Sequence, residues 1–209
     1  MITTERINVR NDCQGFDTAI EAAEEFGVLI KLDKRGITHL RLLTEEMLGM
    51  VQTIAGEFQA VYYAEQDGDV YRLHLDANIS MDPDKRRELI SASTSGKNEA
   101  AKGIMGKIRD FIEVGMENYD EVSTIQSRYS VNPVAYGIVG MDTDAMNQAM
   151  LTWSLKQYRD GLNDNNGAAE GYSEAWDELE KSIVANIADD VKVGIKKDRM
   201  QMTITKKIK

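Results

Sequence analysis

The stretch from 40 to 76, LRLLTEEMLGMVQTIAGEFQAVYYAEQDGDVYRLHLD, contains the two most regular patterns of the chain. Its first part repeats apolar residues at i, i+3 and i+7, which predicts an amphipathic helix between residues 36 and 56. Its second part has two runs rich in Val, Tyr and Leu, 58–64 and 70–76. Between them, Asp67-Gly68 permits the positive backbone angles of a tight turn. The stretch therefore predicts a helix followed by a β-hairpin.

The flanking sequence predicts elements that complete a sheet with helices. A strand is expected over 6–10, a helix from the N-cap Asp17 to a stop at Gly27, a helix over 99–113, a final helix that begins at Ser173, and a C-terminal hairpin over 191–204. The order β, α, α, β, β, loop, α, insertion, α, β, β predicts an α+β fold. We expect a mixed or antiparallel sheet with the helices on one face.

Residues 115–172 show weaker periodicity, and the run Asn163–Gly167 has the composition of a surface linker. We interpret this segment as a mainly helical insertion within a single domain that spans 1–209. Trp153 and Tyr158 are expected to be partly exposed, and Trp176 is expected to be buried. The outer face of the insertion would then recruit a protein partner or a second copy of the chain.

Composition limits the classes of ligand. The 35 acidic and 25 basic residues give a formal charge of −10, which argues against nucleic acid as a partner. A single cysteine excludes an intrachain disulfide and fits a reducing compartment, and no window approaches the roughly 20 apolar residues of a membrane helix. We therefore expect a cytoplasmic protein. With two histidines and one cysteine, no transition-metal site is predicted.

Three segments bear candidate chemistry. In the first, Leu42–Met50, Glu45 and the residue four positions later share one helix face, where a carboxylate could orient water and an amide could hold Mg²⁺; that second residue is Gly49. The second segment, Asp76–Asp82, follows the hairpin. The third, 94–108, contains glycines and lysines before a helix whose free N–H groups would suit an anion.

In this order, and with the hairpin between the first two, these segments resemble the GHKL, or histidine-kinase-type, ATPases, especially the bacterial anti-sigma-factor serine kinases. The resemblance covers about 5–113 and 173–206. It implies a two-layer α/β sandwich that binds ATP with Mg²⁺. Glu45 is similar to the family's catalytic glutamate; without the resemblance, it would be a solvated charge on a helix flank.

The resemblance also implies a nucleotide site. Asp76 occupies the position that reads adenine, and Asn78 and Ser80 replace the two glycines that let the backbone approach the base. Without the resemblance, Asp76 would be a turn or cap residue.

The third segment resembles the family's glycine-rich lid. Its phosphate-binding residues would be Lys97, Lys102, Gly103 and Gly106. The two glycines are equally compatible with a helix that packs closely against the sheet.

Three functions are compatible with these patterns. Loss of the Mg²⁺ amide and of both glycines favours a regulatory or pseudo-enzymatic GHKL-like protein with weak or lost ATP binding, which acts through a protein partner. Retention of Glu45, Asp76 and the lid glycines favours an active anti-sigma-type serine kinase or ATPase. An interaction module without a ligand is the third. Since function depends on the site and not on the fold, fold likeness does not choose among them.

Overall fold

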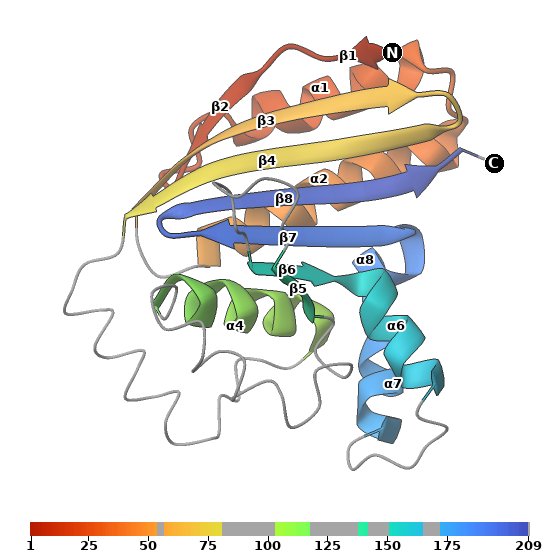
Figure 1. Ribbon diagram of the computed structural model, residues 1–209. Coiled ribbons are helices and arrows are strands. Elements are labelled where there is room, and N and C mark those ends of the chain that lie inside the picture. The colour runs from red at the N-terminus through yellow and green to blue at the C-terminus, as the bar shows by residue number, and fades with distance from the viewer. Residues whose placement is uncertain (54–56, 81–102, 118–137, 142–150, 165–171, 209) are drawn as a thin grey trace.

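The computed structural model describes residues 1–53, 57–80, 103–117, 138–141, 151–164 and 172–208. Eight strands form one antiparallel sheet in the order β1-β3-β4-β8-β7-β6-β5, and β2 also pairs with β3 (Figure 1). The strands are β1 (Ile2–Thr3), β2 (Ile7–Arg10), β3 (Glu57–Asp67), β4 (Val70–Ser80), β5 (Ile138–Met141), β6 (Leu151–Ser154), β7 (Asp190–Lys196) and β8 (Arg199–Lys207). The helices are α1 (Phe16–Leu29), α2 (Lys34–Thr53), α4 (Gly103–Glu117), α6 (Leu155–Asp164), α7 (Tyr172–Lys181) and α8 (Ile183–Ile187).

The predicted hairpin is confirmed as β3 and β4, which pair without interruption from Glu57 and Ser80 to Asp67 and Val70. Gly68 has φ 61 at the turn, which is the positive angle that glycine adopts without steric cost. Alternate residues of both strands are buried. This period of two places one face of the hairpin against the core and leaves the other polar.

Helices α1 and α2 lie behind β3, β4 and β8 (Figure 1). Helix α1 begins after Gly15 (φ 85), not at an Asp17 cap, and it continues through Gly27 to Leu29. A Cβ on Gly27 would lie 3.0 Å from Ile37 Cγ1, so this glycine permits the close approach of α1 and α2 and does not end the helix. The hydroxyls of Thr44 on α2 and Tyr62 on β3, both fully buried, are 2.9 Å apart and fix α2 against the sheet.

The C-terminal hairpin of β7 and β8 is confirmed, and β8 pairs with β4. The predicted last helix is divided in two, because Ser182 ends α7 and caps α8 by accepting a hydrogen bond from the Ala185 N–H.

The described parts of 115–172 include the helix α6 but also two strands of the sheet, so the prediction of an appendage separate from the sheet is wrong there. Strand β6 pairs with both β5 and β7, so this segment completes the sheet. Trp153 and Tyr158 are each 1% exposed and belong to the core, in contrast to the partial exposure that we expected. Trp176 is partly buried against the same core, in the direction expected.

The helices cover one face of the sheet. The buried side chains of β3, β4, β7 and β8 alternate along each strand and lie on one face, and α4 reaches that face where Gly115 approaches Ile195. The expectation of an antiparallel sheet with helices on one face is therefore confirmed. Within the described residues, no helix is both long enough and apolar enough to cross a membrane.

Candidate functional site

A cavity of about 760 Å³ opens where α2, the start of α4 and the junction of α7 with α8 meet. We call it the acidic cavity. Its lining residues are Glu46, Gly103, Ile104, Met105, Glu174, Asp177, Glu178, Lys181, Ser182 and Ile183. It lies beside the beginning of α4, where the resemblance would place phosphates, so it is the cavity in which a nucleotide would be expected.

Carboxylates dominate this cavity. Among the described residues, the lining contains four acidic residues and one basic residue, which gives this part of the lining a formal charge of −3. Lys181 Nζ lies 3.7 Å from an Asp177 carboxylate oxygen, one helical turn away. Behind the lining, Lys107 Nζ lies 3.1 Å from Glu178 Oε2 and 5.9 Å from the centre of the Tyr158 ring. Even with Lys107 included, the described residues of the acidic cavity keep an excess of two negative charges.

The described lining includes the starts of two helices, α4 at Gly103 and α8 at Ser182 and Ile183. Gly103 has φ 81, and a Cβ there would have no described atom within 4 Å, so glycine is required by the backbone angle and not by crowding. The unpaired N–H groups of a helix start attract anions. Gly106, the other predicted phosphate contact, is buried in α4 and does not line the cavity.

Glu45 does not face the acidic cavity. Its Oε1 accepts a hydrogen bond from Arg41 Nε at 2.8 Å, and Arg41 Nη1 also donates to Glu24 Oε1 of α1 at 3.0 Å. Glu45 therefore belongs to a surface network between α1 and α2. The neighbouring Glu46, turned by about 100° around the helix, lines the cavity instead.

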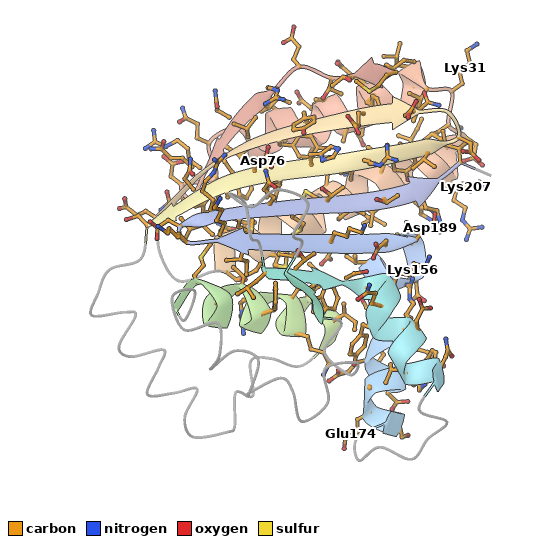
Figure 2. The ribbon with its side chains drawn as sticks, in the orientation of Figure 1. Lys31, Asp76, Lys156, Glu174, Asp189 and Lys207 are labelled. Carbon is orange, nitrogen blue, oxygen red and sulfur yellow. The ribbon has the colours of Figure 1, made fainter. Side chains whose placement is uncertain are left out.

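Asp76, Asn78 and Ser80 lie on the opposite face of the sheet from the helices. They alternate with the buried Ala77 and Ile79 along β4, and Asn78 and Ser80 are exposed. Asp76 pairs in register with Val61 and Gln201, and its charge is the second cause, after burial, that raises the pKa of Tyr63 (Figure 2). The structure thus separates Asp76 from both Glu45 and the acidic cavity.

The remaining predicted lid contacts, Lys97 and Lys102, lie outside the described residues. Of the predicted site residues, only Gly103 lines the acidic cavity. The sequence interpretation missed Glu46, Glu174, Asp177 and Glu178. Their shared signal was an acidic stripe, since the last three recur at i, i+3 and i+4 on one face of α7.

No group of three or more His, Cys, Asp or Glu side chains that could hold a metal ion is found among the described residues. The acidic side chains of the described lining give this cavity a negative potential, which can attract a cation. In comparisons with known proteins, the chain matches no family model, and neither a curated protein nor a solved structure shows significant similarity to it.

Proposed function

We propose that this chain is a regulatory, non-catalytic protein of GHKL-like architecture, in which ATP binding is weak or lost and the acidic cavity takes a cationic segment of a protein partner. The observation that carries the proposal is the excess of carboxylates in the cavity where a nucleotide would be expected. A second copy of the chain is the partner if the protein self-associates.

Electrostatics disfavours a triphosphate in this cavity. Two unit charges 4 Å apart interact by about 4 kcal/mol at an effective dielectric constant near 20. Each phosphate placed beside the start of α4 would face several carboxylates, whereas a helix N-terminus contributes only about 0.3–1 kcal/mol in return. A lysine or arginine side chain would be attracted by the same carboxylates. It would lose little of its hydration on binding, because the cavity is open to solvent.

The separation of the predicted catalytic groups supports the same proposal. A base and an adenine-reading acid must face one ligand, and Glu45 and Asp76 lie on opposite sides of the sheet layer. The GHKL-like sandwich itself stays part of the proposal. Its support is the order of the described elements: a strand, two helices, a hairpin, a helix beyond the lid segment and a C-terminal hairpin.

An ATP-dependent serine kinase or ATPase is the second candidate. The observation in its favour is that the first turn of α4, with Gly103 in a positive-φ conformation, lines the cavity. In that case Glu46 would be the candidate base in place of Glu45. Mg²⁺ would bind to carboxylates of the lining and would offset their repulsion of the nucleotide.

Thermal unfolding with ATP, with ATP plus Mg²⁺ and with a tetralysine peptide distinguishes the two candidates. We expect the peptide to raise the unfolding temperature and millimolar ATP to leave it unchanged. A ligand at 100 times its dissociation constant adds about 2.7 kcal/mol of stability. A shift of that size with ATP, abolished by Glu46→Gln, would overturn the regulatory proposal and favour the enzyme. Sedimentation velocity then shows whether the partner is a second copy.

A further inference from the structure

A second cavity, of about 500 Å³, lies at the other end of α2, and it is lined by cationic groups. We call it the basic cavity. It is formed by the turn between α1 and α2, the first turns of α2, the end of β8 and the last residues of α8. Its polar lining includes Lys31, Arg35, His39, Tyr71, Lys206 and Lys207. Figure 2 shows Lys31 and Lys207 at one end of the molecule, away from Glu174 of the acidic cavity.

Two of the four cationic side chains are neutralised by neighbours. Lys206 Nζ lies 3.2 Å from Asp189 Oδ1, and Lys207 Nζ lies 3.1 Å from Asp69 Oδ2. Lys31 and Arg35 have no ion pair with any described residue. Lys31 and Arg35 are therefore the described cations of the lining without an ion pair, and with Asp33 counted the described lining and its paired acids have a formal charge of +1, in a chain whose formal charge is −10.

Asp33, the acidic residue of the described lining, caps α2. Asp33 Oδ1 accepts the Gly36 N–H at 2.7 Å, which makes Asp33 the N-terminal cap of α2. The 20-residue helix directs its positive end toward this cavity, and the N–H groups of its first turn add to the field of the cations, whereas that of Ile37 already donates to Asp33 O at 3.0 Å.

Lys31 holds its position at a conformational cost. It has φ 61, a left-handed angle that costs a non-glycine residue roughly 1–2 kcal/mol. Its N–H donates to Val28 O at 3.0 Å, and the next N–H, of Leu32, donates to Gly27 O at 2.9 Å, so the turn is closed by backbone bonds that glycine would make equally well. The side chain of Lys31 is thus not needed for the turn, and its charge stands at the cavity.

His39 and Tyr71 supply neutral donors beside these cations. The pKa of His39 is lowered by burial first, then by the charges of Arg35 and Lys206, against a smaller opposite effect of Asp33. Burial, followed by the charge of Asp189, raises the pKa of Tyr71 to about 12. Near neutral pH, both groups can therefore donate a hydrogen bond to an anion without themselves being charged.

We propose that the basic cavity binds a small anion that carries a phosphate group, held by Lys31 and Arg35 with hydrogen bonds from His39 and the start of α2. Arginine forms bidentate bonds to phosphate, and the charges of Lys31 and Arg35 together exceed the single negative charge of Asp33 in the same lining. The proposal is independent of the proposed function, because the acidic cavity shares no lining residue with this one.

The two histidines of the chain make a direct test possible by NMR. His39 lies in the basic cavity, whereas His74 on β4 stacks on Tyr63 at 4.5 Å on the opposite face of the sheet and is an internal control. Titration with inorganic phosphate and, separately, with O-phosphoserine should shift the His39 imidazole resonances and raise the His39 pKa. Sodium chloride at equal ionic strength should not reproduce the shift. Stronger binding of O-phosphoserine would identify a phosphate ester as the source, and equal binding would identify free phosphate.

Variants test whether Lys31 and Arg35 hold the anion. Lys31→Gln together with Arg35→Gln should weaken phosphate binding at least tenfold. Lys34→Gln removes one cation from the same helix start, and Lys34 does not line the cavity, so this variant should change affinity less than twofold, whereas Arg35→Gln alone, with the same change in charge, should weaken binding measurably. All of these side chains are exposed, and thermal unfolding verifies that each variant is folded. The proposal is overturned if chloride shifts His39 as phosphate does, or if the double variant binds phosphate as the native chain does.

Discussion

The acidic and basic cavities lie along the same helix and have opposite charge. Glu46 of α2 faces the first cavity, and His39 faces the second, seven residues earlier. At 1.5 Å per residue, the two positions are roughly 10 Å apart along the helix axis. A net charge of −10 therefore does not describe either cavity, because the ligand class is set by the side chains that converge locally. The cavities also differ in the elements that hold their walls.

The largest effect should come from Trp153→Ala, which tests that difference in support. Trp153 is buried in β6, and its ring lies 6.2 Å from that of Tyr158 on α6, the helix that packs against α7. We expect a loss of about 3–5 kcal/mol in the free energy of unfolding, measured with urea. The wall of the acidic cavity should loosen first, so tetralysine binding should weaken while the phosphate response of His39 is kept.

Leu29→Ala is the control for this truncation. Leu29 is a large apolar residue that is 60% exposed, and its removal should change stability by no more than about 0.5 kcal/mol. If Trp153→Ala lowers the free energy of unfolding as little as Leu29→Ala does, β6 and α6 do not belong to the core. They would then form an appendage, as the sequence predicted.

Charge reversal at two adjacent residues sharpens the comparison further. Glu46→Lys should weaken tetralysine binding about tenfold, equivalent to about 1.4 kcal/mol, because it replaces a lining carboxylate by a cation. Glu45→Lys makes the same change on the side of α2 that faces α1, and affinity should stay within a factor of two. Calorimetric titration measures both. Equal losses would mean that only long-range charge attracts the peptide and that the cavity has no defined site.

The Glu45 and Glu46 pair also shows how far the sequence could lead. Apolar spacing predicted α2 and its buried stripe correctly, because burial of a helix face is a property of the local pattern. Which flank of that stripe faces a cavity depends on where α1, α4 and α7 pack, and that is tertiary information. One residue of difference is about 100° of rotation, so the predicted Glu45 faces α1, whereas Glu46 lines the acidic cavity.

Two further differences have the same origin. Asp76 was expected where the second hairpin strand ends, but β4 continues to Ser80, and the alternation with Ala77 turns Asp76 away from the helices. Strand β6 was missed because a period of two over only Leu151–Ser154 is too short a signal beside a helix that begins immediately after it. The residues of the basic cavity come from the α1–α2 turn, α2, β4, α8 and β8, and no local motif connects them.

An intermediate effect is expected at Asp33, because its carboxylate stabilises α2 as a cap but repels an anion in the basic cavity. Asp33→Ala removes the acceptor for the Gly36 N–H and should lower stability by about 1 kcal/mol. Asp33→Asn keeps a capping oxygen but removes the negative charge from the basic cavity, so stability should be nearly unchanged while phosphate binds more tightly. Thermal unfolding and the His39 titration measure the two effects separately. If Asp33→Asn weakens phosphate binding, the anion does not lie beside this carboxylate.

The smallest effect is the pH dependence that His39 confers on stability. Its pKa in the folded chain is lowered from 6.5, so the unfolded chain takes up the proton more readily as the pH falls. The stabilisation from neutral His39 is therefore complete above about 6.5, and it is lost as the pH decreases through 6.5 toward the folded value. His39→Gln should remove this loss of stability. The unfolding free energy of the native chain minus that of the variant should therefore decrease as the pH falls from 7.5 to 5.5, a window of roughly two units around the ordinary pKa of histidine. Taking that difference cancels the carboxylates that titrate in both proteins. Saturating phosphate should reverse the trend, because an anion beside His39 favours the imidazolium and raises its pKa. A difference that stays constant with pH, with and without phosphate, would mean that neither the cations nor the anion act on this side chain.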